Sequence, residues 1–373
     1  MRYKVLFVNY PLQYRNLKKE LDAAIKRVLI NGDLILRSDV DELERNIASF
    51  VGTKYAVGLN SCTDALILSL KAAGIIEGDE IITVSHTFFA TIEAIVHCRA
   101  KPILVEVGKD FVMDVKGLRE AITRKTKAII PVHLNGHLCN MEEIVQIAKE
   151  NNLIVIEDAA QALGAKLNGR MAGSFGLTGC FSFYPAKLLG AFGDGGMAVT
   201  NDKDVAEKIR LLRNHGQKSK TEIVLYGFTS RLHNIQAAVL NVKFGYLNQW
   251  INRRREIALI YENALSEVKG IKLPSAPNAD PRFFDIFQNY VLRSQRRDEL
   301  FEFLKENGIE TLIKDPVPNH LHKGLGLSHF HLPFTEQLAK EVISLPMYPE
   351  LTNEQVEYVT DTVRKFYRST GGK

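Results

Sequence analysis

The sequence has few cysteines and no long apolar run. Its four cysteines, Cys62, Cys98, Cys139 and Cys180, form no CxxC pair and lack histidines at zinc-finger spacing. We therefore expect reduced thiols, no metal site and a cytoplasmic protein. The opening MRYKVLFVNYPLQ lacks the long apolar region and cleavage site of a signal peptide. No stretch approaches the ~18 apolar residues of a membrane helix, so we expect no membrane partner.

Strong net charge is also absent. The 48 basic and 43 acidic residues give a formal net charge of +5 over 373 residues. The densest basic run, 253–255, lies in a helical pattern, and a solvated helix face explains it better than a nucleic-acid contact. Neither GxGxxG nor GxxxxGK[ST] occurs, which argues against a nicotinamide-dependent oxidoreductase and against a P-loop enzyme.

What the sequence does contain is an alternation of short Val- and Ile-rich runs with amphipathic stretches. The runs are too short for helices and predict strands. They are the segments 55–59, 80–84, 102–107, 128–134, 153–158, 180–184 and 197–200. Helical patterns at 63–74 and 141–152 lie between some of them. This order predicts an α/β fold with a mostly parallel sheet covered by helices, in which ligands bind beyond the carboxyl ends of the strands.

The pattern changes after Trp250. A long helical stretch leads to the proline-rich segment 273–284, which is followed by a short strand pattern, a helix and the loop KDPVPNH. We predict a large domain over residues 1–250 and a smaller α+β domain over residues 251–373.

Two polar stretches follow predicted strands. Asp158 and Gln161 come after a very apolar strand, where a buried carboxylate needs a positive partner. Asp158 could instead cap a following helix. Lys187 lies between the next strand and the glycine-rich segment 193–196, which we interpret as a turn. By its setting alone, Lys187 could be a surface lysine.

A third stretch, LNSCTDALILSL at 59–70, has the pattern of a strand, a turn and a helix. Backbone N–H groups at a helix start bind phosphate, although Thr63 could equally be only a helix cap. Phe88 follows another strand and is either core or a ligand platform. A phosphate site, a carboxylate, an aromatic face and a lysine at one sheet edge are the parts that pyridoxal 5'-phosphate requires.

The chain resembles the DegT/DnrJ/EryC1/StrS family of sugar aminotransferases, which have the aspartate aminotransferase fold (PLP-dependent transferase fold type I). The resemblance runs over nearly the full length. It is carried by KYAVGLNSCTDAL, SHTFFATIEAI, VHLNGH, VIEDAAQALGA, FSFYPAKLLGAFGDGG, RNHGQ, SRLHNIQAAVLNVKF and SLPMYP. It implies pyridoxal 5'-phosphate as cofactor, a homodimer with shared active sites and a role in amino sugar biosynthesis.

The resemblance assigns roles to individual residues. Lys187 matches the lysine that binds the cofactor covalently and then moves the proton. Asp158 matches the partner of the ring nitrogen, and Gln161 matches the residue beside the phenolic oxygen. The other cofactor contacts that it implies are the phosphate-binding Cys62, Thr63 and Ser182 and the stacking Phe88.

The resemblance also implies that the partner subunit donates the loop 227–238, with Arg231 as a ligand contact. Two positions depart from the family pattern, because Thr229 stands where asparagine is usual and His233 where aspartate is usual. That asparagine reaches the neighbouring cofactor phosphate, whereas Thr229 would reach it through water or not at all. Arg37 replaces a frequent glycine and either pairs with an anionic substrate group or lies in solvent.

The substrate class is indicated by two segments. The pattern SRLxxIQAAVLxVK and the loop KDPVPNHLH, with His320 as a candidate contact, resemble members that act on 3-keto sugar nucleotides. We therefore expect transfer of an amino group from L-glutamate to a dTDP- or UDP-linked 3-keto sugar. The alternatives are a 4-keto sugar nucleotide aminotransferase and a non-catalytic regulatory protein that binds the cofactor or a sugar nucleotide. Lys187 disfavours the family's dehydratases, which carry histidine there.

Overall fold

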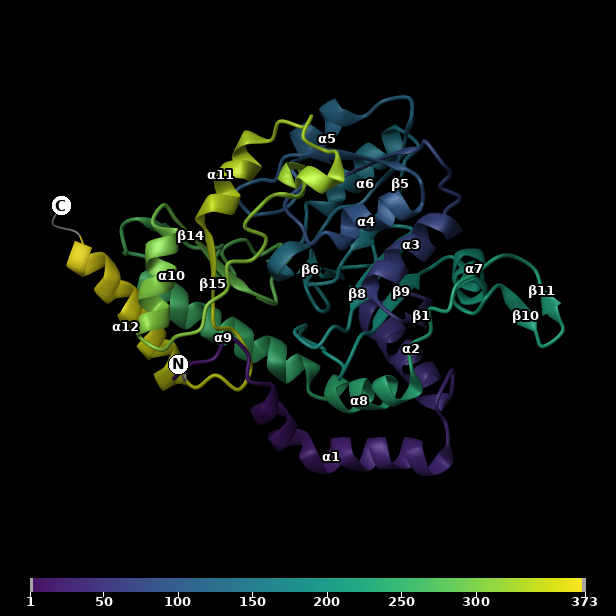
Figure 1. Ribbon diagram of the computed structural model, residues 1–373, viewed down its shortest axis with the longest axis horizontal. Helices are drawn as coiled ribbons and strands as arrows, with labels where there is room; N and C mark the ends of the chain where they lie inside the picture. Colours follow the sequence, from purple (N-terminus) through teal and green to yellow (C-terminus); the bar gives the residue numbers. More distant parts are fainter. Residues whose placement is uncertain (1–2, 371–373) are drawn as a thin grey trace.

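The structure is a computed structural model and describes residues 3–370. Its centre is a seven-stranded sheet in the order β1-β9-β8-β5-β4-β2-β3 (Figure 1). The strands are β1 (Tyr55–Leu59), β2 (Glu80–Val84), β3 (Lys101–Val105), β4 (Thr126–Ile129), β5 (Ile154–Asp158), β8 (Thr178–Ser182) and β9 (Gly196–Thr200). Each of the seven predicted strands is therefore confirmed, with boundaries that shift by a few residues.

The sheet is mostly parallel, as predicted. β5 pairs in parallel with β4 and β8, and β2 pairs in parallel with β3 and β4. β9 runs against both of its neighbours, β1 and β8. Most residues of these strands are buried, because helices cover both faces of the sheet. That burial explains why the strands read as continuous apolar runs rather than as alternating ones.

Two apolar layers flank the sheet. One is formed with helices α3 (Cys62–Ala72), α4 (Ala90–His97) and α7 (Lys203–Arg213). The other is formed with α1 (Tyr10–Asn31), α2 (Ser38–Val51), α5 (Val115–Ala121), α6 (Met141–Glu150) and α8 (Asn234–Phe244). The predicted helices at 63–74 and 141–152 correspond to α3 and α6, so the helix–sheet–helix layering follows from the sequence pattern.

The C-terminal part of the chain forms a second, smaller sheet with its own core. Its strands are β12 (Ile271–Lys272), β14 (Tyr290–Ser294) and β15 (Val342–Leu345). The helices that pack there are α9 (Leu247–Leu265), α10 (Arg297–Glu306) and α12 (Asn353–Thr370). The division at residue 250 stays a prediction, and α9 runs across it.

Several short elements complete the fold. β6 (Lys166–Leu167), β7 (Arg170–Met171) and β13 (Phe283–Phe284) form a three-stranded sheet. The hairpin of β10 (Gln217–Ser219) and β11 (Glu222–Ile223) projects from the body of the molecule (Figure 1). Short 3-10 turns span Leu134–Gly136, Asn319–Leu321 and Lys323–Leu325, and α11 spans Pro333–Glu341.

Residues 3–370 contain neither a candidate membrane helix nor a candidate metal site. No helix in this range combines the length and the apolar character needed to cross a bilayer. The same range holds no group of three or more histidine, cysteine or acidic side chains placed to bind a metal ion. The four cysteines are free thiols and all are buried.

Candidate active site

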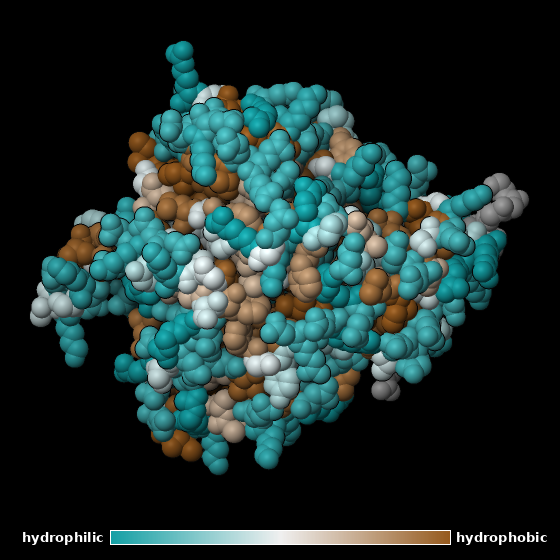
Figure 2. All heavy atoms as spheres, turned by 180° about the vertical axis from the view of Figure 1, so that it is seen from behind, coloured by the Kyte–Doolittle hydropathy of each residue, from teal (hydrophilic) through white to brown (hydrophobic). Residues whose placement is uncertain are grey.

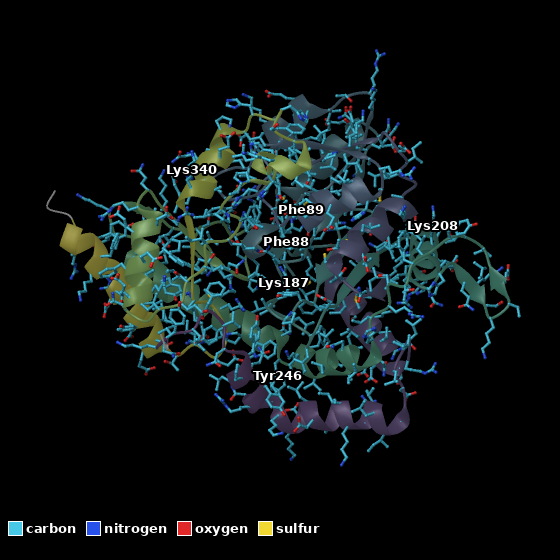
Figure 3. The ribbon with its side chains drawn as sticks, viewed as in Figure 1. Phe88, Phe89, Lys187, Lys208, Tyr246 and Lys340 are labelled. Atoms are coloured by element: carbon cyan, nitrogen blue, oxygen red, sulfur yellow. The ribbon has the colours of Figure 1, made fainter. Side chains whose placement is uncertain are left out.

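A cavity of about 470 Å³ opens beyond the carboxyl ends of β5 and β8, beside the start of α3. Asp158 ends β5 and Ser182 ends β8, so both side chains reach the cavity from the sheet edge that binds ligands in this fold class. Seven of the predicted site residues line it: Cys62, Thr63, Phe88, Asp158, Gln161, Ser182 and Lys187. Phe88 and Lys187 lie near the centre of Figure 3.

The start of α3 borders this cavity as a helix N-terminus with free donors. Ser61 is its cap, since the Ser61 hydroxyl accepts a hydrogen bond from Asp64 N at 3.0 Å. The alternative that Thr63 is only a cap is therefore wrong. The first turn leaves the N–H groups of Cys62 and Thr63 without intrahelical acceptors, which suits an anionic group. A Cβ at Gly196 would lie 2.2 Å from the Ser61 carbonyl carbon, so glycine is required where β9 passes this turn.

Asp158 is a buried carboxylate held in a defined orientation. Thr91 Oγ1 donates to Asp158 Oδ2 at 2.7 Å, and Ala160 N donates to Oδ1 at 3.2 Å. Thr87 Oγ1 lies 3.0 Å from Thr91 Oγ1 and extends this chain of hydroxyls. No helix follows Asp158, so the alternative that it caps one is wrong. Among the described residues no cationic side chain forms an ion pair with Asp158, and Lys187 and Lys314 act on it only through space. The carboxylate is therefore available to a positively charged group of a ligand.

Lys187 lies on the loop that connects β8 to β9. Its side chain is half-buried and lines the cavity. Lys187 is therefore not a surface lysine, which was the alternative that its local sequence also allowed. Burial, together with the charge of Lys314, lowers the pKa of Lys187 from 10.5 to about 7. At neutral pH a large fraction of this amine is therefore unprotonated and nucleophilic. Asp194 and Gly195, at the end of the same loop, also line the cavity.

A glutamine from the C-terminal half of the chain holds the backbone on both sides of Lys187. Gln288 Oε1 accepts from Leu188 N at 2.8 Å, and Gln288 Nε2 donates to Ala186 O at 2.9 Å. Arg254 Nη1 in turn donates to Gln288 O at 3.0 Å. Gln288 and Arg254 are both buried, so the position of Lys187 depends on contacts with the segment that leads into the smaller sheet.

Gln161 is fixed by two donors on its side-chain oxygen. Asn135 N donates to Gln161 Oε1 at 3.0 Å, and Asn289 Nδ2 donates to the same atom at 3.2 Å. Beside it, His133 is fully buried and lies 3.0 Å from Glu157 Oε2. These contacts set the side-chain amide of Gln161 at the cavity wall.

Three predicted site residues do not line this cavity. Thr229 is exposed, and its hydroxyl lies 2.9 Å from His215 Nε2. Arg231 Nη1 donates to Asn214 Oδ1 at 3.2 Å. His320 is fully buried, and its Nδ1 lies 2.7 Å from Ser85 Oγ, so it anchors its own loop behind the end of β2.

His233 and Arg37, the other two departures from the family pattern, both lie at the surface of the subunit. His233 is exposed at the start of α8, where its side chain makes no capping hydrogen bond. Arg37 is largely exposed and lies 3.6 Å from Asp33. Within one subunit, Arg37 thus lies in solvent, which was one of the two alternatives for this residue.

Sequence reasoning missed three residues of the site. Thr91 supports Asp158, Gln288 supports the Lys187 loop and Lys314 lines the cavity. A signal existed for both Thr91 and Lys314. Thr91 lies in SHTFFATIEAI, which carries the resemblance, and Lys314 begins the loop KDPVPNHLH, which we associated with the substrate. Gln288 gave no signal, since its partners are backbone groups 100 positions away.

Known proteins of one family resemble this chain over nearly its whole length. The sequence profile of the DegT/DnrJ/EryC1/StrS aminotransferase family matches residues 15–364. A "Pleiotropic regulatory protein" of Geobacillus stearothermophilus is 44% identical over 95% of this chain and 96% of its own length. The dTDP-3-amino-3,4,6-trideoxy-alpha-D-glucose transaminase of Streptomyces venezuelae is 40% identical over 97% of this chain and 96% of its own length. The X-ray structure of S. venezuelae DesV, solved with a ketimine intermediate, superposes with a TM-score of 0.94 at 39% identity and 98% coverage of both chains.

Proposed function

Because the chain belongs to the DegT/DnrJ/EryC1/StrS aminotransferase family, we propose that it moves an amino group from L-glutamate to a dTDP- or UDP-linked 3-keto sugar. The observation that carries this proposal is the cavity that joins the low-pKa amine of Lys187 to the buried carboxylate of Asp158. Transamination needs such an amine to move protons and such a carboxylate to complement a cationic ring nitrogen.

The residues of the cavity fit pyridoxal 5'-phosphate. Asp158 lacks a cationic partner, which a protonated ring nitrogen would supply. The start of α3 offers free N–H groups for a phosphate, and the Ser182 hydroxyl lies on the same wall. The exposed face of Phe88 offers an apolar surface for a flat ring. Bound there, the cofactor supplies an aldehyde for the amine and a ring that withdraws electrons from the reacting carbon.

Lys187 then carries the acid–base work. Its Nζ accepts the proton from the amino-bearing carbon of the donor and returns a proton in the opposite half-reaction. A pKa of about 7 suits both directions at neutral pH, since neither protonation state is strongly favoured. Gln288 keeps the lysine at the cavity by fixing the backbone of Ala186 and Leu188.

The sugar class follows from the relatives and from the sequence pattern. The S. venezuelae transaminase carries in its name a sugar with the amino group at carbon 3. This chain resembles it over nearly its whole length and has the loop segments that we associate with 3-keto substrates. Amination at carbon 4 remains the alternative, and the cytoplasmic location stays a prediction.

We propose a homodimer in which each subunit completes the site of the other. The projecting β10–β11 hairpin and the segment after it expose Ile223, Val224 and Tyr226, and Figure 2 shows hydrophobic atoms on this projection. Large exposed side chains gathered on one projection are typical of an interaction surface. Thr229 and Arg231 follow closely in the chain and lie outside the cavity of their own subunit, which suits donation to a partner.

A second candidate is supported by the regulatory name of the Geobacillus stearothermophilus relative. In that case the cavity would bind the cofactor or a sugar nucleotide without turnover. The complete set of cavity residues, Lys187 included, favours the enzyme, because binding alone does not require an amine of low pKa.

The test is the visible absorption spectrum of the purified protein, loaded with pyridoxal phosphate, before and after addition of L-glutamate. We expect an absorption band of the bound cofactor that shifts with glutamate, and a Lys187→Ala variant that shows neither the native band nor the shift. A native band that ignores glutamate and other amino donors would favour the regulatory protein. A protein that takes up no cofactor would contradict both candidates.

A further inference from the structure

A second lysine faces the cavity that holds Lys187. Lys314 lies in the loop that leads from the smaller sheet back to the end of β2, and its side chain lines the cavity. It makes no hydrogen bond or ion pair with any side chain or carbonyl group among residues 3–370. A half-buried ammonium group without a partner is costly, so this position is adapted to an anion that arrives with a ligand.

The charges around Lys314 narrow the location of that anion. The carboxylates of Asp315 and Asp158 act on Lys314 through space without forming an ion pair with it. Lys314 and Lys187 line the same cavity, and the charge of Lys314, after burial, lowers the pKa of Lys187. An anion bound by Lys314 therefore shares the cavity with the reactive amine.

The proposed reaction brings four anionic groups to the site: the cofactor phosphate, the diphosphate of the sugar nucleotide, and the α- and γ-carboxylates of glutamate. The cofactor phosphate has its own cradle at the start of α3. The diphosphate of a sugar nucleotide is several bonds away from carbon 3 of the sugar. The γ-carboxylate of glutamate is also several bonds from the reacting carbon, whereas the α-carboxylate is attached directly to the carbon that bears the amino group. Of these groups the α-carboxylate therefore has to lie closest to the Lys187 amine, with which Lys314 shares the cavity.

Resting on the proposed function, we propose that Lys314 is the donor-specificity residue and binds the α-carboxylate of the amino acid. Asp315, the next residue in this loop, has a left-handed backbone conformation with a φ of 50°, which aspartate adopts more readily than most residues. The sugar nucleotide carries its charge on the diphosphate, several bonds from carbon 3, so it places no anionic group where the α-carboxylate of the amino acid lies. Lys314 thereby distinguishes the amino acid from the sugar nucleotide by the charge that each places next to it.

The test uses the enzyme loaded with pyridoxal phosphate and follows the glutamate half-reaction alone by stopped-flow absorption. Lys314→Met keeps the length of the side chain and removes the charge, whereas Lys314→Arg keeps the charge. Lys340→Met is the matched control, because Lys340 is exposed on α11 at the periphery of the view in Figure 3. We expect Lys314→Met to lower the second-order rate constant for glutamate by at least about 30-fold, and Lys340→Met to leave it unchanged.

Further probes distinguish the α-carboxylate from the other anionic groups. For the wild type, 4-aminobutanoate, which lacks an α-carboxylate, should react at least about 30-fold more slowly than glutamate, and Lys314→Met should remove most of this difference. Lys314→Met should leave the affinities for dTDP, UDP and pyridoxal phosphate within about twofold of the wild type.

Two results would overturn the assignment while leaving the proposed function intact. One is an unchanged glutamate half-reaction in Lys314→Met. The other is a loss of nucleotide or cofactor affinity large enough to account for the slower reaction. A wild-type enzyme that ignores glutamate and other amino donors would instead contradict the proposed function itself.

Discussion

The hydroxyl of Thr91 donates a 2.7 Å hydrogen bond to Asp158, the carboxylate at the base of the cavity. Thr91 is fully buried, so water cannot replace this donor if it is removed. The orientation of Asp158 is thus set by a helix on one face of the sheet rather than by the strand that carries it.

We expect Thr91→Val to weaken binding of pyridoxal phosphate. The substitution preserves shape but removes a hydrogen bond to a charged group, which is worth about 1.5–3 kcal/mol. Cofactor affinity should fall by about 10- to 100-fold, measured by equilibrium titration of the apo protein. Thr91→Ser keeps the hydroxyl and should retain most of the affinity. Equal affinities for the valine variant and the wild type would contradict this role.

Cofactor uptake by the apo protein should depend on pH with a midpoint near 7. Lys187 has a pKa lowered to about 7, and only its unprotonated form attacks an aldehyde. The uptake rate should therefore be low in acid, rise through pH 7 and then level off. Stopped-flow absorption across a pH series measures this profile. In Lys314→Met the midpoint should move upward, because a neighbouring positive charge has been removed.

Gln288→Leu should destabilise the Lys187 loop. The leucine leaves the N–H of Leu188 and the carbonyl of Ala186 without partners in a buried place. Each such loss costs about 1–3 kcal/mol, so urea unfolding of the apo protein should show a reduced free energy of unfolding. The glutamate half-reaction should also slow. An unchanged free energy of unfolding would show that these backbone groups find other partners.

Charges on the projecting hairpin should dissociate the dimer that we propose. We expect Ile223→Glu combined with Tyr226→Glu to give a monomer in light scattering, with lower activity, because both side chains are highly exposed in one subunit. Ile76→Glu is a matched control, since Ile76 is also exposed but lies elsewhere, after α3. A double variant that remains dimeric and active would exclude the hairpin from the interface.

The fold was largely predictable because its strands are buried on both faces. The run IVIED of β5 is apolar up to its last two residues, so its type and its end could be inferred from the sequence alone. Asp158 was harder, because a carboxylate after a strand also fits a helix cap. The structure shows that Asp158 is a cavity carboxylate and not a helix cap, and its hydrogen-bond donor is Thr91, 67 positions away. This contact forms only when α4 packs against the sheet.

Two of the residues that sequence reasoning missed, Gln288 and Lys314, reach the site from the C-terminal part of the chain. Their contacts with the site depend on how that part packs against the large sheet, which spacing and periodicity along the chain do not show. His320 lies in the loop that we associated with the substrate. Its Nδ1 lies 2.7 Å from Ser85 Oγ, and within one subunit it is not among the residues that line the cavity.

The two hydrogen bonds from Gln288 connect the reactive lysine to the part of the chain that enters the smaller sheet. Any hinge motion that rotates this part about α9 has to stretch or break them. A change in the angle between the two sheets should then change the mobility of Lys187. A fluorophore or spin label on each sheet would measure the separation of the sheets, and the absorption band of cofactor bound to Lys187 would show whether the lysine responds to the same motion.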